Sequence, residues 1–427
     1  MGEGILTSGF TRVDGALVCD GVSLDEIATA VGTPAYVYSA ATVRDRYARL
    51  NSALAVLPHR VHYTLKANSN AAILRLVREL GAGADVVSGG ELFRARQAGF
   101  AGSDIIFGGV GKTERELCEA LAAGVMLINV ESDAEIRLLD RLAGELGVVA
   151  SVGLRVNPEV TVDSSHRYIK TGEKGAKFGI PFDEVLTVAR VAAALPHTRL
   201  VGLDMHIGSQ IFRLDPYIDG VERLTALLDE LRASGVDTIR FLDIGGGLGV
   251  SYDDEESPDL QRFARALVPR VRATGLTLLM EPGRFVVGNS GVLLTRVLYR
   301  KHSGGRDFLI TDAGMTELLR PSHYDAYHRI EPVAPPTGRM KADVVGPVCE
   351  SGDFLALDRE MAEVNPGDLL AVFDVGAYGY VMASNYNTRP RGVEVLVDAD
   401  RYAVVTARER YEDLVRLEQA DPEWRQG

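Results

Sequence analysis

A regular alternation of short apolar strands and amphipathic helices begins at Val61 and constrains the fold of this chain more than any other feature. Amphipathic segments such as Asp133 to Leu146 and Pro216 to Ala233 separate the strand candidates. An open doubly wound sheet seldom reaches eight strands without a break, so the pattern predicts a (β/α)8 barrel of the TIM type, in the α/β class. The expected strands are 61–66, 84–88, 104–108, 126–130, 151–156, 200–208, 238–245 and 277–282.

The rhythm changes after Arg284, where strands follow one another and helices are scarce until Glu409. This change predicts a second, mainly β domain. A β segment outside a closed barrel needs a sheet to pair with, so the strand before the barrel is expected to join that domain. We predict a barrel domain at 36–286 and a mainly β domain made of 1–35 and 287–427.

The composition excludes several kinds of partner. A net charge of −13 and a pI near 5.2 oppose binding to nucleic acid or to an anionic membrane. The mean hydropathy is +0.03, and no apolar run is long enough to span a membrane. The cysteines Cys19, Cys118 and Cys349 lie too far apart for a metal-site spacing. We expect a cytoplasmic protein without a bound metal.

Lys66 stands where the first strand of the alternation ends, in Tyr63-Thr64-Leu65-Lys66-Ala67-Asn68. Catalytic groups of such barrels are carried at the carboxyl ends of the strands. A lone lysine there is more often a solvated strand end, but the later strand ends also carry polar or glycine residues. Together they suit an aldehyde cofactor that bonds an amine and carries a phosphate, and pyridoxal phosphate fits each part. These residues are Asp85, Ser88, Asn157, His206, Ser209, Gly245, Gly246, Gly247, Glu281 and Arg284.

Each candidate has a chemical role and an ordinary alternative. The turn Gly245-Gly246-Gly247 could expose N–H groups to a phosphate, or be a flexible turn. Glu281 could keep a pyridine nitrogen protonated, or form an ion pair. His206 could stack on the cofactor ring, or be a core histidine. Asp85 could cap a helix or face a group next to the cofactor.

Two stretches beyond the barrel also carry candidate chemistry. Cys349 lies between acids and small residues in Val348-Cys349-Glu350-Ser351-Gly352-Asp353 and could donate a proton if its thiol is exposed. Otherwise it is a small buried hydrophobe. Tyr378, in Gly376-Ala377-Tyr378-Gly379-Tyr380, could reach a phosphate or a substrate, or pack on the domain surface. Both stretches are expected to lie in the β domain, so reaching the barrel rim requires an interdomain cleft or a partner subunit.

Taken together, these stretches resemble the fold-type III pyridoxal-phosphate-dependent decarboxylases. The resemblance runs from about residue 20 to residue 405, with the motifs in order. Within the family, the chain is most similar to the branch that acts on diaminopimelate. The stretches that carry the resemblance are Tyr63 to Asn68, Gly83 to Leu92, His206 to Gln210, Gly245 to Gly249, Glu281 to Arg284, Cys349 to Asp353 and Tyr378 to Arg391.

The resemblance implies that the chain decarboxylates meso-2,6-diaminopimelate to L-lysine and CO2, the last step of lysine biosynthesis. It implies catalytic roles for Lys66, His206 and the general acid Cys349, with Cys349 and its neighbours supplied by the second subunit of a homodimer. The implied cofactor-binding residues are Lys66, Asp85, His206, Ser209, Gly245, Gly246, Gly247, Glu281, Gly283, Arg284 and Tyr378. The implied substrate-binding residues are Arg284, Arg320, Tyr324, Glu350 and Tyr378.

The chain departs from the family pattern on either side of Arg320. Thr316-Glu317 stand where the family has Asn-Asp, and Ser322-His323 stand where it has Ala-Leu. A decarboxylase of a related or carrier-bound amino acid, or a cofactor-binding relative without catalysis, therefore stays open. A racemase of the same fold type is disfavoured, because racemases usually place an arginine where Glu281 stands.

Overall fold

The computed structural model describes residues 9–161, 175–253 and 255–425, and these residues form two compact units. We call Ala40–Ser290 with Gly376–Val381 the barrel unit. The β unit consists of the described residues of Met1–Ser39, Gly291–Val375 and Met382–Gly427. The segment that carries Tyr378 therefore packs with the barrel, although it comes late in the sequence.

The barrel unit is built on eight parallel strands that pair in sequence order. The last strand pairs back to the first, with Leu278 opposite His59 and Met280 opposite Val61, so the barrel is closed. The predicted TIM-type barrel is thereby confirmed. The strands are β5 (His59–Thr64), β6 (Gly83–Val86), β7 (Ile105–Phe107), β8 (Leu127–Val130), β9 (Ala150–Asn157), β11 (Thr198–Asp204), β12 (Phe241–Asp243) and β13 (Thr277–Met280), and the short β10 (Ile180–Pro181) adds to β9.

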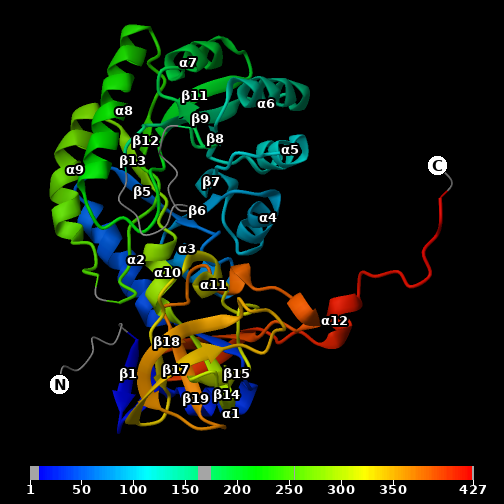
Figure 1. Cartoon of the computed structure of the whole chain (residues 1–427). Helices are drawn as coiled ribbons and strands as arrows, with labels where there is room; N and C mark the ends of the chain where they lie inside the picture. Colours follow the sequence, from blue (N-terminus) through cyan, green and yellow to red (C-terminus); the bar gives the residue numbers. More distant parts are fainter. Residues whose placement is uncertain (1–8, 162–174, 254, 426–427) are drawn as a thin grey trace. The chain divides into compact units, whose positions relative to one another are not determined.

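Helices cover the outside of the barrel strands (Figure 1). Several begin at a side chain that accepts a backbone N–H of the first turn, as Ser88, Thr113 and Ser132 do. Such caps satisfy donors that a helix start leaves unpaired. The helices are α2 (Ala40–Leu54), α3 (Ala71–Glu79), α4 (Gly89–Gln97), α5 (Glu114–Ala123), α6 (Asp133–Leu146), α7 (Val185–Ala194), α8 (Asp215–Ala233), α9 (Leu260–Thr274) and the short α10 (Arg284–Val287).

An apolar cluster joins four barrel strands and consists of Ile106, Leu127, Val201 and Leu279. Side chains of this kind fill the interior of an eight-stranded barrel and leave no pore. The candidate site residues of the barrel unit lie instead near the carboxyl ends of the strands. The fold therefore separates a packed interior from a chemically active rim.

The β unit is a mostly antiparallel sheet. β4 (Ala35–Ser39), the strand just before the barrel, pairs antiparallel with β14 and parallel with β20. The other strands of this sheet are β14 (Gly291–Ser303), β15 (Arg306–Thr311), β16 (Ile330–Pro332), β17 (Thr337–Val345), β18 (Phe354–Glu363), β19 (Leu369–Phe373), β20 (Val393–Asp398) and β21 (Arg401–Thr406). A small sheet of β1 (Phe10–Val13), β2 (Ala16–Cys19) and β3 (Val22–Ser23) comes before this larger sheet in the chain. The α-helices in the described part of the β unit are α1 (Leu24–Val31), α11 (Arg320–Tyr324) and α12 (Tyr411–Val415).

Several elements differ from their predicted bounds. β11 ends at Asp204 rather than at residue 208. β18 was not expected: its central Asp-Arg-Glu run hides the alternation of apolar residues, and the strand lies at the end of the sheet, where charged side chains are normal.

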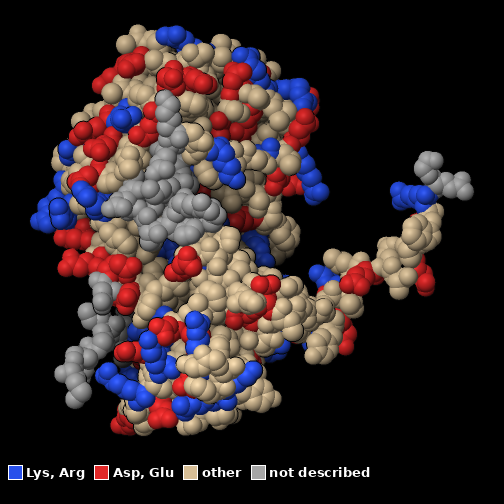
Figure 2. All heavy atoms as spheres, viewed as in Figure 1, with Lys and Arg blue, Asp and Glu red and all other residues tan. Residues whose placement is uncertain are grey.

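Two surface properties bear on possible partners. No helix in the described ranges is both long and apolar enough to cross a membrane. On the described part of the face shown in Figure 2, Lys and Arg side chains are interspersed with Asp and Glu, and no continuous basic stripe is present.

Candidate active site

Lys66 lies two residues beyond β5, on a segment bound to its neighbours through the backbone. The N–H of Leu65 donates to Asp85 O at 3.1 Å, and the N–H of Ala67 donates to Thr64 O at 3.3 Å. Burial at the barrel end would lower the pKa of Lys66, but electrostatic interactions with Tyr378, Asp85 and Glu281 outweigh it and raise that pKa above its ordinary value. Lys66 remains exposed to solvent. The site therefore presents a reachable amine among acidic groups.

Asp85, the next-to-last residue of β6, acts on this lysine and is buried. Burial raises the pKa of Asp85, while the Lys66 charge and a hydrogen bond from Thr64 act in the opposite direction. A buried carboxylate next to an ammonium group fixes the lysine electrostatically. The structure thus brings together two of the predicted cofactor-binding residues.

Asp204, Asp243 and Glu281 form a group that we call the carboxylate triad. They stand at the ends of the adjacent strands β11, β12 and β13, and their nearest carboxylate oxygens all lie within 4.8 Å of one another. Burial raises the pKa of Asp243 to about 7. Burial, and then the charges of Asp243, Asp85 and Asp204, raise the pKa of Glu281 well above its ordinary value. Such a group can share protons or hold a hard cation.

The glycine turn after β12 is fixed to the triad and to His206. The N–H of Gly245 donates to Asp243 Oδ1 at 2.9 Å, and that of Gly246 donates to His206 Nδ1 at 3.3 Å. A Cβ on Gly246 would lie 2.2 Å from Glu281 O, so only glycine fits there. These two N–H groups already have acceptors within the protein. The turn thus positions its neighbours, whatever else it binds.

His206 is a neutral imidazole in this setting. Burial, together with the charges of Lys66 and Arg155, lowers its pKa well below the ordinary value. Because Nδ1 accepts the hydrogen bond from Gly246, the ring proton of the neutral form is on Nε2. A flat, uncharged ring beside Lys66 suits stacking against an aromatic cofactor ring.

Arg284 supplies a buried positive charge at the same end of the barrel. Its guanidinium donates to Tyr252 Oη at 2.7 Å and to Ser209 Oγ at 3.2 Å, and it lies 4.7 Å from the centre of the Tyr378 ring. The N–H of Tyr378 donates to Ala67 O at 2.8 Å. Tyr378 therefore reaches the rim from within the barrel unit. A guanidinium beside hydroxyl groups is well suited to an anion such as a phosphate.

The remaining predicted residues lie in the β unit. Arg320, buried at the start of α11, donates from Nη1 to His328 Nε2 at 2.8 Å, and His328 Nδ1 donates to Phe373 O at 2.7 Å. Tyr324, at the end of α11, lies edge-on to the His323 ring with centres 4.6 Å apart. The buried histidine orients the arginine. Sequence reasoning missed His328, which carries no signal of its own.

Cys349 and Glu350 are both exposed, on the loop between β17 and β18. The interpretation of Cys349 as a buried hydrophobe is therefore wrong. The carboxylate of Asp353 holds this loop, because it accepts the N–H groups of Met315 and Val348, each at 2.6 Å. A thiol on a loop held in this way is accessible to a substrate.

The residues that depart from the family pattern fall into two groups. Thr316 and Glu317 are buried, and Glu317 Oε2 accepts the N–H of Gly314 and the hydroxyl of Thr316, each at 2.9 Å. They shape their own loop and present no side chain to solvent. Ser322 is half-buried and His323 is exposed, so these two are the ones that could touch a ligand.

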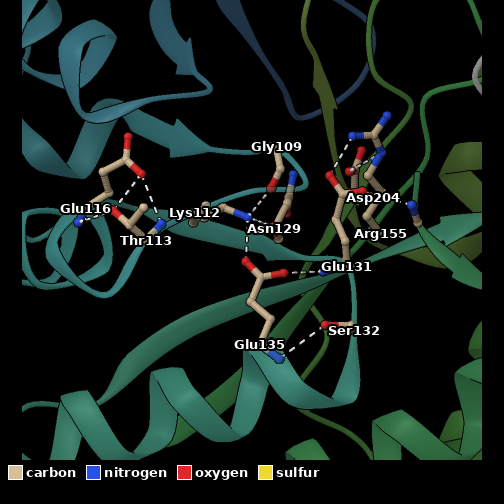
Figure 3. A network of polar contacts seen from close by, with 11 residues as sticks. Gly109, Lys112, Thr113, Glu116, Asn129, Glu131, Ser132, Glu135, Arg155 and Asp204 are labelled. Atoms are coloured by element: carbon tan, nitrogen blue, oxygen red, sulfur yellow. Dashed lines mark hydrogen bonds and ion pairs between the residues drawn. The ribbon is translucent and has the colours of Figure 1, made fainter. Parts of the chain in front are cut away.

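A polar network behind the rim was not predicted (Figure 3). Arg155, on β9, donates to Glu131 at 2.8 Å and lies 3.9 Å from Asp204. Lys112 has a fully buried side chain whose Nζ donates to Gly109 O, Asn129 O and Glu135 Oε1 at 2.6–2.7 Å. The only sequence signal for Arg155 was its position two residues before Asn157 at a strand end.

Comparison with known proteins gives concordant results. Residues 40–288 match the family model described as "Pyridoxal-dependent decarboxylase, pyridoxal binding domain". Diaminopimelate decarboxylase of Pseudomonas aeruginosa is 48% identical over 97% of this chain and 99% of its own length. The structure of diaminopimelate decarboxylase from Helicobacter pylori complexed with L-lysine has a TM-score of 0.89 at 40% identity, covering 92% of this chain and 98% of that one. The enzyme from M. jannaschii in complex with L-lysine has a TM-score of 0.92 at 35% identity, covering 97% and 99%.

Proposed function

The chain belongs to the diaminopimelate decarboxylase family of pyridoxal-dependent decarboxylases, and on this premise we propose that it converts meso-2,6-diaminopimelate to L-lysine and CO2. The observation that carries the proposal is that the exposed Lys66 stands at the strand end where Asp85 and Glu281 both act on its charge, at the barrel end that also holds Arg284. A carboxy-lyase of this family needs an amine, a ring-facing acid and an anion site together. The barrel unit has all three.

The residues present fit pyridoxal phosphate. Lys66 offers the amine for its aldehyde, Glu281 a carboxylate for its ring nitrogen, and His206 a neutral ring for its face. Arg284 and Ser209, next to the glycine turn that excludes side chains, suit the phosphate. When bound, this cofactor supplies an electron sink for the electron pair that remains after a carboxylate leaves as CO2.

The chain's own groups then bind the substrate and deliver the proton. Arg320, oriented by His328, suits the distal carboxylate of diaminopimelate, and Glu350 suits the distal amine. Tyr324 lies on the same short helix as Arg320 and would line the substrate. Cys349 Sγ donates the proton that replaces CO2 at the α-carbon.

We propose further that the enzyme is a cytoplasmic homodimer, in which the second copy presents Cys349 and Glu350 to the barrel rim. Two features support this arrangement: the exposure of both residues on one loop, and the resemblance to decarboxylases whose sites lie at a subunit interface. Mixing Lys66→Ala chains with Cys349→Ala chains tests it, because mixed dimers would regain one intact site. Without regained turnover, shared sites are excluded.

The substrate is tested by CO2 release from cofactor-loaded protein offered meso-diaminopimelate, ornithine, lysine and arginine separately. We expect turnover of diaminopimelate alone, with lysine as the product. Turnover of another amino acid would keep the decarboxylase activity but change the proposed substrate, and Ser322 and His323 would be the residues to test for substrate selection. Cofactor binding without turnover of any of the four would favour a carrier-bound substrate or a non-catalytic relative. The Lys66→Ala variant is the control and should lose both the covalent cofactor absorbance and turnover.

A further inference from the structure

Among the described residues, the charged side chains that act on the carboxylate triad are acidic more often than basic. Lys66 and Arg155 are the cations that act on the carboxylate triad, and Asp85 and Glu131 are its acidic neighbours. Arg155 donates to Glu131 at 2.8 Å but lies 3.9 Å from Asp204, so its closest ion pair lies outside the triad (Figure 3). The second oxygen of Glu131 accepts the N–H of Gly179 at 2.8 Å, which holds that glutamate in place. Within the part of the chain that the structure describes, the triad therefore has too few cations beside it for three ionised carboxylates.

Asp243 is the member of the triad with the most restricted surroundings. It is 0% exposed, and its Oδ1 accepts the N–H of Gly245 at 2.9 Å. Its Oδ2 has no hydrogen-bond partner among the described residues. A carboxylate oxygen of Glu281 lies within 4.8 Å of a carboxylate oxygen of Asp243. A buried carboxylate oxygen without a donor is costly. A proton between Asp243 and Glu281 would satisfy this oxygen.

The same glycine links the two acids through its backbone. Gly245 N–H binds the Asp243 side chain, and Gly245 O accepts the N–H of Glu281 at 2.8 Å. The glycine also cannot be replaced easily, because it has φ +67° and a Cβ there would lie 2.6 Å from Met205 O. The turn therefore holds Asp243 and Glu281 at a fixed mutual position.

We propose that Asp243 is the positioning residue of Glu281: the two carboxylates share one proton, and Asp243 holds it when Glu281 faces the ring nitrogen of the cofactor. The proton moves from a carboxylate oxygen of Glu281 to Oδ2 of Asp243, so the charge of the pair does not change. Glu281 is then the ionised partner and Asp243 its hydrogen-bond donor. This inference rests on the proposed cofactor.

The surroundings of the pair agree with a retained proton. Burial raises the pKa of Asp243 to about 7. Burial also raises the pKa of Glu281, and the nearby charges of Asp243, Asp85 and Asp204 raise it further. Burial, and then Asp243, raise the pKa of Asp204 well above its ordinary value, while Arg155 opposes the shift. Burial, and then the charges of Lys66 and Arg155, lower the pKa of His206 well below its ordinary value, so this ring adds no cation near neutral pH.

The test is infrared spectroscopy of the cofactor-loaded protein near neutral pH, in which a protonated carboxyl group gives a C=O band that shifts in D2O. Asp243→Asn keeps an acceptor for Gly245 N–H and directs an amide donor toward Glu281, so it copies the protonated aspartate without a removable proton. We expect the wild-type band to disappear in Asp243→Asn and to persist in Asp204→Asn. Asp343→Asn is the matched control, because Asp343 is a buried aspartate that accepts the N–H of Asp358 at 2.6 Å, and it should keep the band.

A second measurement does not depend on any variant folding. Wild-type protein labelled with ¹³C at every aspartate carboxyl should show the band at a lower frequency if Asp243 carries the proton. An unshifted band would place the proton on Glu281 and overturn the inference, as would a band lost in Asp204→Asn but retained in Asp243→Asn. Absence of the band from loaded wild-type protein would also overturn it. Failure of the protein to take up pyridoxal phosphate would instead overturn the proposed function.

Discussion

Buried carboxylates occur in both units of this molecule, but they have different partners. In the barrel unit, Asp204 and Asp243 each have an oxygen without a hydrogen-bond donor among the described residues, and they face other acids. In the β unit, Asp353 and Glu317 accept backbone N–H groups at 2.6–2.9 Å and hold loops. A carboxylate that faces acids is arranged to bind or exchange protons, whereas one that faces N–H groups serves as a fixed part of the scaffold.

Within the β unit, buried and exposed side chains of one loop also differ in the role that we expect of them. Asp353 is buried and positions the loop, while Cys349 and Glu350 are exposed on it. A substitution at the exposed end of this loop should therefore change turnover, and one at the buried end should change stability. The following predictions use this contrast.

The largest expected effect is that of Cys349→Ala. Turnover should fall by about 10²–10⁴-fold, the usual contribution of a positioned general acid, because only proton delivery is removed. The cofactor absorbance should stay unchanged, since the barrel residues are intact. Cys118→Ala, at a half-buried cysteine of α5, is the control and should retain wild-type turnover. Full turnover of Cys349→Ala would mean that another group is the acid.

A smaller effect is expected for Asp353→Asn. One of the two N–H groups that Asp353 accepts would face an amide donor, which costs about 1–3 kcal/mol of the free energy of unfolding. Urea denaturation measures this loss, and equilibrium titration should show unchanged cofactor affinity. The exposed Glu350→Gln is the matched variant, with a stability change within about 0.5 kcal/mol. Equal stability of the two variants would remove the distinction between buried and exposed ends of the loop.

Acids of the two units are also expected to differ in how their contributions to stability respond to pH. Burial raises the pKa of Asp243 from 3.8 to about 7, so the folded chain binds this proton more tightly and loses stability as pH rises through that range. Burial alone would raise the pKa of Glu409 in the β unit, but hydrogen bonds from Arg391 lower it from 4.5 to about 2, so its stabilisation is present above pH 4.5 and is lost as pH falls toward 2.

Urea denaturation of the cofactor-free chain at a series of pH values measures both slopes. Asp243→Asn should reduce the slope between 3.8 and about 7, and Glu409→Gln should reduce the opposite slope between 4.5 and about 2. If both substitutions changed the pH dependence of the free energy of unfolding over the same pH range, the contrast between the units would not hold.

Much of the barrel could be predicted because each strand end carries its own signal. Lys66, His206 and the glycine run each mark the place where an apolar segment stops, and the closed barrel brings those ends together. The β unit was harder, since β18 is an edge strand whose exposed charged residues obscure its alternation. Edge strands owe their place to the neighbouring strand more than to their own sequence.

The carboxylate triad shows why part of the site could not be predicted. Asp204 is part of β11, and alternation along a strand decides which side chains face the interior. The pairing of β11 with β9 shifts between Leu200 and Gly202, so the alternation changes within the strand. The sequence does not reveal such a shift, and Asp204 was not singled out. Arg155 and His328 were missed because their partners, Glu131 and Phe373 O, are distant in sequence.

The closed barrel can also be considered as two half-barrels, β5–β8 and β9–β13, that meet at two seams. At the seam between β8 and β9, the first half contributes the acid Glu131 and the second half the cation Arg155. At the seam between β13 and β5, the polarity is reversed: the first half contributes the cation Lys66 and the second half the acid Glu281. The two halves therefore complement each other in charge at both seams when the barrel closes in the observed strand order. The charges that prepare the rim for chemistry thus also disfavour an incorrect closure of the barrel.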